Sequence, residues 1–371
     1  MRILLAAGGT GGHLIPAIHI AEALQRCRPD CEMMFIGSDK GFEEQVVTAR
    51  GYTYAGLPAR GLSRRRPWRN IPALWRNWQA RQLSQRIVGK FAPDIAVGCG
   101  GYASYFPIRA CARRGVPYVL QEQNSYPGLA TRWLAPGARC VFLAFPQSRG
   151  YLKSDVHIEP VGNPVDPRLS TMTREEARRA WNLDIHTRVI LLTGGSGGAH
   201  SMNANIAMGL SRVSPAVPTT LLWQSGRHAD EYGGNAHAGW TVRRFTFSDQ
   251  MTEAMVASDL VIGRAGALTV SEIAAAGRAA ILVPYPYATA DHQMHNARVL
   301  SDAGAAIIIE DCELKCDSLL ERALRLLDDS SRMQSMAQAS RALGQPNAAD
   351  RIADRILGIV TTPPSTREKT S

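Results

Sequence analysis

Several features are absent from this sequence of 371 residues, and each absence excludes a class of protein. It has no run of about 18 uncharged apolar residues, the length that a transmembrane helix requires. The apolar run at residues 3–7 is shorter than the core of a secretory signal peptide, and glycines follow it directly. We therefore expect a cytoplasmic protein without a membrane-spanning helix.

Cysteine is uncommon, and its number, seven, is odd, which disfavours a framework of disulfides. The pairs Cys27/Cys31 and Cys312/Cys316 share a four-residue spacing that would place two metal ligands on one side of a helix. Reduced thiols are the simpler interpretation in a cytoplasmic protein. We accordingly predict no metal site and no cofactor.

Acidic residues are missing from one long stretch, between Glu44 and Asp94. The net charge of +10 is therefore unevenly distributed, and the first half of the chain must carry a strongly positive face. Such a face attracts an anionic partner or surface. The basic residues of this stretch are Arg50, Arg60, Arg64, Arg65, Arg66, Arg69, Arg76, Arg81, Arg86 and Lys90.

Two glycine-rich segments repeat one pattern, ILLAAGGTGGH at residues 3–13 and ILLTGGSGGAH at residues 190–200. Each reads as a buried strand, a glycine turn and the start of a helix. Neither has the G-x-G-x-x-G spacing of dinucleotide-binding turns or the lysine of a P-loop. Glycine lets the backbone approach a ligand, and a helix N-terminus offers N–H groups to a phosphate or a sugar hydroxyl.

Strand and helix patterns alternate after each of these turns, which favours a parallel sheet in each half of the chain. We predict an α/β fold of two Rossmann-like domains that face each other across a cleft, with ligands beyond the carboxyl ends of the strands. The boundary should lie near residues 161–164, and the polar residues 358–371 should form a flexible tail. The expected strand segments are 3–7, 32–37, 52–57, 94–100 and 117–124 in the first half and 189–193, 219–226, 241–247, 259–266, 279–286 and 305–310 in the second.

Seven sequence blocks follow one another along the chain: GGTGGHLIPA (8–17), GGYAS (100–104), EQN (122–124), GNP (162–164), GGSGGA (194–199), RAGALTVSEIAAAG (264–277) and PYPYATADHQMHNA (284–297). Together they resemble the bacterial peptidoglycan glycosyltransferases that make lipid II from lipid I. The resemblance covers about residues 1–355 and implies the two-domain glycosyltransferase B architecture, an inverting mechanism and UDP-N-acetylglucosamine as donor. It also implies domains at 1–162 and 163–340, with a C-terminal helix at 341–357 that packs back onto the first domain.

Two residues of the first half are candidates for the general base. His13 ends the first glycine turn, and an imidazole titrates near neutral pH, so it can take a proton from an attacking alcohol. A packed or capping histidine is the alternative, and the family resemblance favours the catalytic role. Glu122 is the second candidate, as the base or as the group that orients it. The residues expected to contact polar groups of the substrates are Thr10, Gly11, Gly12 and Asn124.

The RAGALTVSEIAAAG block predicts a diphosphate site in the second half. The amides of Ala267, Leu268 and Thr269 come at the start of a helix, where they suit an anion. Glu272, in or near the first turn of that helix, either complements the helix dipole or binds the two ribose hydroxyls. The family resemblance favours the ribose.

Three further residues of the second half complete the predicted donor site. Gln293 follows a strand, and its amide can both donate to and accept from hydroxyls. The resemblance assigns the N-acetylglucosamine hydroxyls to Gln293 and the uracil edge to the strand end near Phe247. Ser196, in the second glycine turn, should line the donor side.

Two features of the sequence concern the diphosphate. The sequence has no D-x-D motif, so we expect the helix dipole and hydrogen bonds, without a metal, to stabilise the UDP leaving group. Family members often have an arginine two residues after GNP, where this chain has Asp166. Either Arg168 or Arg264 then supplies the positive charge, or the helix amides suffice.

Segment 64–81 combines arginines with tryptophans. Tryptophan favours the membrane interface, and each basic residue near an anionic surface contributes about 1 kcal/mol. We predict a peripheral protein that docks through this segment on the cytoplasmic face of the bacterial inner (plasma) membrane, where lipid I resides. The alternative is that the tryptophans are core residues. No nucleic-acid module is recognisable, so we expect no nucleic-acid partner. The apolar residues at helical spacing around Pro72 are Ile71, Leu74, Trp75 and Trp78.

The predicted reaction transfers N-acetylglucosamine from UDP-N-acetylglucosamine to the 4-hydroxyl of the lipid-linked N-acetylmuramoyl-pentapeptide, lipid I. That hydroxyl attacks the anomeric carbon from the face opposite UDP, which inverts the configuration and forms lipid II. Within this class, the alternative is a related transferase that uses another membrane lipid, such as a diacylglycerol. Outside it, the alternative is a protein that binds or epimerises a nucleotide sugar without transferring it.

Overall fold

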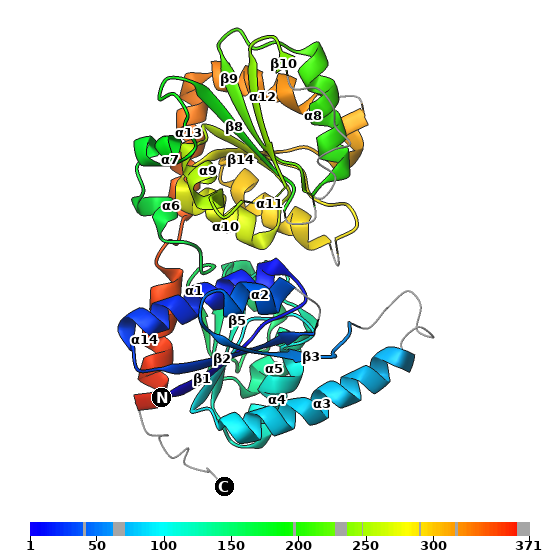
Figure 1. Cartoon of the computed structure of the whole chain (residues 1–371), viewed down its shortest axis with the longest axis vertical. Helices are drawn as coiled ribbons and strands as arrows, with labels where there is room; N and C mark the ends of the chain where they lie inside the picture. Colours follow the sequence, from blue (N-terminus) through cyan, green and yellow to red (C-terminus); the bar gives the residue numbers. More distant parts are fainter. Residues whose placement is uncertain are drawn as a thin grey trace. The chain divides into compact units, whose positions relative to one another are not determined.

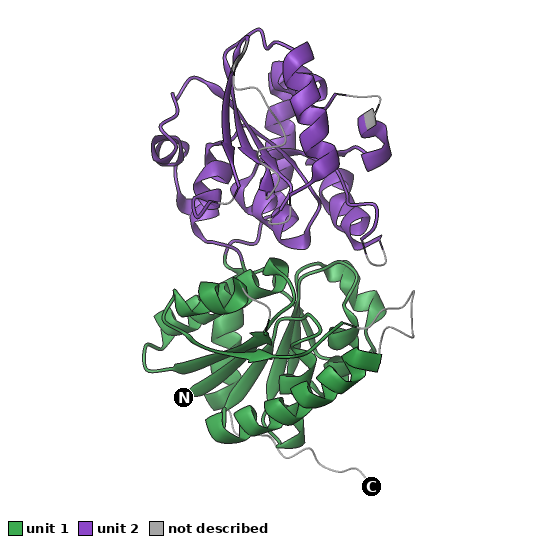
Figure 2. Cartoon of the chain, turned by 45° about the vertical axis from the view of Figure 1, so that its right-hand side comes forward, with its two compact units in different colours: residues 1–164, 347–371 green, residues 165–346 purple. Residues whose placement is uncertain are grey.

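The computed structural model describes residues 1–39, 42–61, 71–195, 198–226, 236–246, 248–288, 291–315 and 318–361. These residues form two compact units, coloured in Figure 2: Met1–Pro164 with Asn347–Ser371, and Val165–Pro346. The sequence placed the first boundary between residues 162 and 163 and the second between 340 and 341. Both units are α/β, as predicted, and each contains one extended sheet (Figure 1).

Unit 1 contains a parallel sheet of seven strands in the order β3-β2-β1-β4-β5-β6-β7. Alternate residues of β1 enter different layers: Ile3 and Leu5 pack with one helical layer, and Leu4 and Ala6 pack with the other. Both faces are covered, which explains why the strand is continuously apolar. The strands are β1 Arg2–Ala6, β2 Glu32–Ser38, β3 Thr53–Leu57, β4 Ile95–Gly98, β5 Tyr118–Glu122, β6 Cys140–Leu143 and β7 Ile158–Pro160. The helices are α1 Gly11–Cys27, α2 Phe42–Thr48, α3 Ile71–Phe91, α4 Tyr105–Arg113, α5 Leu129–Leu134 and α14 Ala348–Thr361.

Unit 2 repeats this plan, with the strand order β10-β11-β9-β8-β12-β13-β14. Only the two-residue edge strand β10 is antiparallel among the described strands. The strands are β8 Arg188–Thr193, β9 Thr219–Gln224, β10 Ala236–His237, β11 Trp240–Phe245, β12 Leu260–Gly263, β13 Ala279–Leu282 and β14 Ala306–Ile308. The helices are α6 Arg168–Thr171, α7 Arg174–Ala180, α8 His200–Arg212, α9 Met251–Ala257, α10 Ala267–Ala276, α11 His292–Asp302, α12 Leu319–Asp328 and α13 Ser330–Leu343.

The strand order reverses at one place in each sheet, between β1 and β4 in unit 1 and between β8 and β12 in unit 2. At such a point the chain leaves neighbouring strands in opposite directions, which opens a crevice at their carboxyl ends. Both glycine turns begin at these points, because β1 and β8 are the strands that precede them. The fold therefore places each turn where an open parallel sheet binds its ligand.

Helix α14 belongs to unit 1, although it follows unit 2 in the sequence. Its residues Ile352 and Ile356 are fully buried in the core that also contains α1. The predicted flexible tail is wrong for residues 358–361, which are helical, because Ile359 and Val360 pack against the same core. The rest of that predicted tail, 362–371, lies outside the described residues.

We expect Ile352→Ala to lower the free energy of unfolding by about 2–5 kcal/mol, because it leaves a cavity between α14 and the unit 1 core. Urea unfolding followed by circular dichroism measures this loss. Arg26→Gln is the control: the Arg26–Asp350 ion pair, 2.6 Å long, is half exposed and should contribute less than about 1 kcal/mol. Equal losses in the two variants would contradict the packing of α14 on α1.

Candidate active site

The first glycine turn, residues 8–12, lies against the loop that follows β4. A Cβ atom on Gly101 would lie 1.9 Å from the carbonyl oxygen of Gly8, and one on Gly9 would lie 2.8 Å from the ring of Tyr102. Gly9 and Gly101 also have φ angles of 99° and 79°, a region that side chains disfavour. A side chain at Gly9 or Gly101 would therefore push the two loops apart.

His13 is the third residue of α1, at the end of this turn. Its Nδ1 atom lies 2.8 Å from the hydroxyl oxygen of Thr10. Its ring lies over the β4 loop, since a Cβ atom on Gly100 would be 2.8 Å from Cδ2 and 3.3 Å from Nε2 of His13. When the Thr10 hydroxyl accepts from Nδ1–H, Nε2 carries the lone pair that a general base needs.

Glu122 ends β5 and is buried, with 2% of its surface exposed. Its carboxylate accepts hydrogen bonds from the amides of Asn124 and Gly128, both at 3.0 Å, and from the Thr131 hydroxyl at 2.5 Å. Burial raises the pKa of Glu122, although these hydrogen bonds act in the opposite direction. Both carboxylate oxygens are bound by the loop after β5 and by Thr131, and this geometry disfavours Glu122 as the base. The Asn124 side chain also donates to Glu122, at 3.3 Å.

Sequence reasoning missed Glu43, a buried carboxylate in contact with the same turn. Its two oxygens accept from the Gly9 amide at 2.6 Å and the Ser38 amide at 2.7 Å. The only available signal was its spacing of four residues from Val47, which places both on the buried face of α2. The neighbouring Glu44 is exposed. Residue type alone could not show which of the two glutamates is buried.

In unit 2, helix α10 starts beside the reversal point between β8 and β12. Gly266 precedes it, and no acidic residue lies in its first turn, which includes Ala267, Leu268 and Thr269. Glu272 is the sixth residue of α10 and lies just beyond its first turn. It shares a face with Leu268 and Thr269, and helical side chains lean toward the N-terminus. The dipole interaction fades beyond the first turn, so this position favours the ribose role.

Gln293 is the second residue of α11, after the loop that leaves β13. Its Oε1 atom accepts a hydrogen bond from the Tyr285 amide at 2.9 Å, which leaves its NH₂ group to donate. From the same helix, the buried Asn296 donates to the Ala265 carbonyl at 3.3 Å. Helix α11 is thereby tied to the turn that begins α10, and Gln293 belongs to the same end of the sheet.

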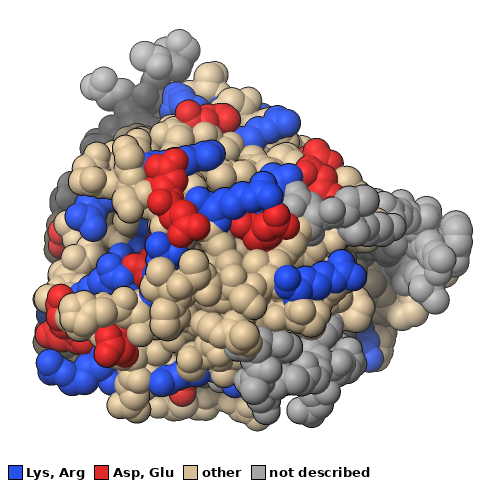
Figure 3. Space-filling model, turned by 90° about the horizontal axis from the view of Figure 1, so that it is seen from above, with Lys and Arg blue, Asp and Glu red and all other residues tan. Residues whose placement is uncertain are grey.

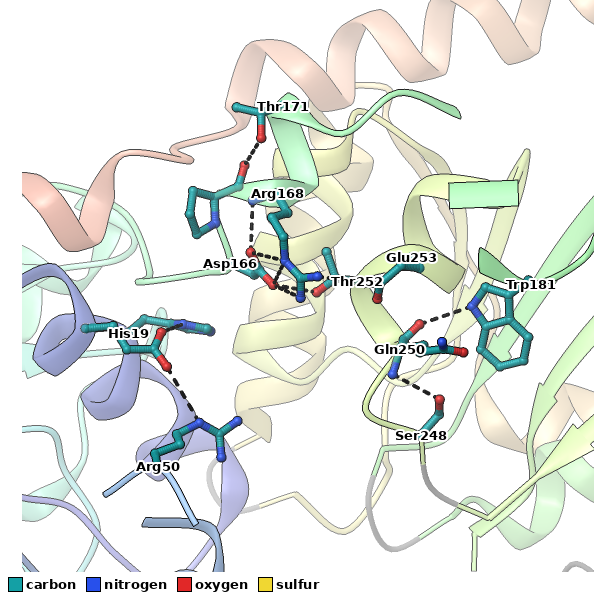
Figure 4. Close-up of polar contacts among 12 residues, drawn as sticks. His19, Arg50, Asp166, Arg168, Thr171, Trp181, Ser248, Gln250, Thr252 and Glu253 are labelled. Atoms are coloured by element: carbon teal, nitrogen blue, oxygen red, sulfur yellow. Dashed lines mark hydrogen bonds and ion pairs between the residues drawn. The ribbon is translucent and has the colours of Figure 1, made fainter. Parts of the chain in front are cut away.

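Arg168 and Arg264, the two arginines considered for the diphosphate, are both paired with carboxylates. Arg168 lies 2.7 Å from Asp166 and 2.6 Å from Glu253 (Figure 4). Arg264 is buried and lies 2.6 Å from Asp311. Their charges are balanced within unit 2, so the geometry disfavours Arg168 as a diphosphate ligand and leaves the α10 amides as the better candidates.

Two predicted donor-site residues, Ser196 and Phe247, lie outside the described residues. The glycines beside Ser196 are described in part. Gly198 has a φ angle of 72°, and a Cβ atom on it would lie 2.9 Å from the Ser225 carbonyl oxygen. The second turn is therefore packed against the end of β9, as the first turn is packed against the β4 loop.

One group of described side chains has the spacing of metal ligands: Cys140, His157 and Glu159, whose ligand atoms lie within 4.8 Å of one another. Arg355 Nε lies 2.8 Å from Glu159, and Arg355 Nη2 lies 3.4 Å from His157 Nε2. The guanidinium already neutralises the carboxylate that a cation would need. These residues therefore fit an ion pair better than a metal site.

Helix α3 exposes the apolar residues of the basic segment. The exposed fractions are 71% for Ile71, 58% for Leu74, 62% for Trp75 and 56% for Trp78, so the interpretation of Trp75 and Trp78 as core residues is wrong. Residues 64–70 of the predicted segment lie outside the described residues. On the face seen in Figure 3, Lys and Arg are interspersed with Asp and Glu, whereas α3 carries no acid. None of the helices within the described ranges is long and apolar enough to cross a bilayer.

Two units, each with a largely parallel sheet and a glycine turn at its reversal point, form the two-domain architecture of B-type glycosyltransferases. The chain belongs to glycosyltransferase family 28: residues 3–143 match the N-terminal domain of that family and residues 189–352 match its C-terminal domain.

Similar proteins span nearly the whole chain. The UDP-N-acetylglucosamine–N-acetylmuramyl-(pentapeptide) pyrophosphoryl-undecaprenol N-acetylglucosamine transferase of Moorella thermoacetica is 36% identical, over 97% of this chain and 99% of the relative. The protein of the same name from Salinibacter ruber is 39% identical, over 96% of each chain. The crystal structure of MurG from Acinetobacter baumannii superposes with a TM-score of 0.73 at 27% identity, over 96% of this chain and 99% of that one.

We expect Gly101→Ala to displace the first glycine turn, because its Cβ atom would meet the Gly8 carbonyl. Gly115→Ala is the matched control: its φ of 74° imposes similar backbone strain, but no atom lies within 4 Å of its Cβ position. Gly115→Ala should cost about 1 kcal/mol of stability, and Gly101→Ala clearly more, with loss of turnover. Thermal unfolding and a transfer assay on both variants measure this. Indistinguishable variants would show that the two loops are not in contact.

Proposed function

We propose that this chain transfers N-acetylglucosamine from UDP-N-acetylglucosamine to the lipid-linked N-acetylmuramoyl-pentapeptide and so forms lipid II. Relatives named for this transfer match it along nearly their full length. The observation that carries the proposal is the chemistry at the two reversal points. His13 follows the glycine turn of unit 1. In unit 2, the α10 N-terminus is followed by Glu272 on the same helix.

The donor binds at the carboxyl end of the unit 2 sheet. The α10 N-terminus takes the diphosphate, since a helix N-terminus without an acidic residue in its first turn favours an anion and both nearby arginines are already paired. Glu272 accepts from the two ribose hydroxyls, and the NH₂ group of Gln293 donates to the sugar. Ser196 and the backbone near Phe247 are assigned to the donor on family resemblance alone.

In the reaction, the 4-hydroxyl oxygen of the acceptor sugar forms a bond to the anomeric carbon of the donor. The bond from that carbon to the diphosphate breaks on the opposite face, which inverts the configuration, and the electron pair leaves with UDP. His13 Nε2 takes the hydroxyl proton. The α10 amides stabilise the charge that develops on the diphosphate, and Glu122 keeps the loop after β5 in place.

The acceptor lipid requires the enzyme to dock on a membrane, and α3 supplies a suitable surface. Its exposed Ile71, Leu74, Trp75 and Trp78 lie among arginines, a combination typical of a helix that rests on anionic lipid. We assign the protein to the cytoplasmic face of the bacterial inner membrane, as a peripheral protein.

A direct assay tests the proposed reaction. Purified protein is given UDP-N-acetylglucosamine with lipid I or with a diacylglycerol, in the same detergent, and both UDP and glycosylated lipid are measured. The expected result is lipid II from lipid I and no product from diacylglycerol. Product from diacylglycerol alone would make the chain a related lipid transferase, and a modified nucleotide sugar without any glycosylated lipid would make it an epimerising enzyme.

We expect Glu272→Ala to weaken donor binding at least tenfold, because hydrogen bonds to a charged group contribute about 1.5–3 kcal/mol. Isothermal titration with UDP-N-acetylglucosamine measures the affinity. Glu175→Ala, which removes an exposed glutamate from the first turn of α7, is the control and should leave the affinity unchanged. If Glu272 only complements the helix dipole, its replacement will lower stability slightly and leave the donor affinity intact.

We expect the double variant Trp75→Ser/Trp78→Ser to sediment less with anionic vesicles, because tryptophan stabilises interfacial binding. The comparison uses phosphatidylglycerol vesicles and, as a control variant, Ile185→Ser, which removes an exposed apolar residue from unit 2. Binding should fall severalfold in the tryptophan variant only. Undiminished binding would assign membrane docking to another surface.

A further inference from the structure

A carboxylate lies buried beneath the glycine turn of unit 1, where the proposed reaction assigns it no role. Glu43 has 1% of its surface exposed. It comes from α2, whereas its partners come from the ends of β1 and β2. A buried carboxylate is costly unless hydrogen bonds compensate it, so its partners indicate its purpose.

The two oxygens of Glu43 join two separate backbone segments. Oε1 accepts from the Gly9 amide at 2.6 Å, directly after β1, and Oε2 accepts from the Ser38 amide at 2.7 Å, at the end of β2. The Tyr54 hydroxyl on β3 lies 2.9 Å from Oε2. Each amide meets a negatively charged acceptor, and such hydrogen bonds are shorter and stronger than neutral ones. The carboxylate therefore sets where Gly9 lies relative to the sheet.

The opposite side of Gly9 is also occupied, because a Cβ atom there would lie 2.8 Å from the Tyr102 ring. The turn is thus held between Tyr102 and Glu43. The next residue is Thr10, whose hydroxyl lies 2.8 Å from Nδ1 of His13. Any shift of Gly9 displaces Thr10, and with it the group that orients the imidazole.

The charge of Glu43 also decides what this turn can bind. It uses the Gly9 amide and places a negative charge beneath the turn, which disfavours a phosphate at that amide. Helix α10 in unit 2 has no acidic residue in its first turn. The start of α10, which is not one of the two glycine turns, therefore has the electrostatics that suit the donor diphosphate.

We propose that Glu43 is a positioning residue: it fixes the turn 8–12 so that Thr10 orients His13 for proton transfer from the acceptor hydroxyl. This rests on the proposed role of His13 as the base. Glutamine cannot replace Glu43 without loss, because both oxygens face N–H donors and an amide offers only one oxygen.

The test compares Glu43→Gln with Tyr118→Phe, a control that removes another buried hydrogen bond of unit 1, from the Tyr118 hydroxyl to the Leu134 carbonyl at 2.7 Å. Both variants are assayed with saturating lipid I and UDP-N-acetylglucosamine, at a temperature where circular dichroism shows both folded. Turnover should fall roughly 10–100-fold in Glu43→Gln and stay within twofold of the wild type in Tyr118→Phe. Equal turnover in the two variants would overturn the proposal.

A second measurement does not depend on turnover. Long-range ¹H–¹⁵N spectra of histidine-labelled protein report the tautomer and environment of each imidazole, and His13→Gln identifies the His13 signals by their loss. The His13 signals should shift in Glu43→Gln and remain in place in Tyr118→Phe. Unshifted His13 signals in Glu43→Gln would overturn the proposal even if turnover falls.

Two outcomes separate this inference from the assignment on which it rests. If His13→Gln keeps full turnover, His13 is not the base and the catalytic role of Glu43 fails with it, whatever the spectra show. If Glu43→Gln does not fold, amide exchange in the wild type decides. The Gly9 amide should be strongly protected, and exchange at the rate of an exposed amide would overturn the proposal.

Discussion

The close approach of two backbones, at Gly8 and Gly101, is the contact on which the rest of unit 1 depends. It occurs where the strand order reverses, because the loops after β1 and β4 leave the sheet side by side. A side chain at Gly101 would overlap the Gly8 carbonyl. The contact therefore restricts the start of the turn, which leads to His13 at the start of α1.

The two units use one architecture for two electrostatic environments. Beneath the unit 1 turn lies the carboxylate of Glu43, bound to the Gly9 amide. In unit 2 the start of α10 has no acid, and the nearby Arg168 and Arg264 are neutralised by carboxylates. Repeated topology therefore carries a buried carboxylate at the reversal point of unit 1 and an acid-free helix start at that of unit 2.

Much of the fold could be predicted because it depends on local patterns. Apolar runs that end in glycine gave β1 and β8, and alternating strand and helix patterns predicted a parallel sheet in each half. Strands β6 and β7, of four and three residues, were not anticipated. The helical residues 358–361 were predicted as tail, because their apolar side chains find partners only in a core built from distant segments.

The sequence by itself determined the two glycine turns, the candidate residues after them and the basic segment that includes α3, because each of these is a contiguous pattern. Only the tertiary structure decided that Glu43 is buried and Glu44 exposed, that Arg168 is paired, and that the α3 tryptophans face outward. Those properties depend on partners far away along the chain. Burial and charge pairing are set by which elements meet, and no local pattern encodes them.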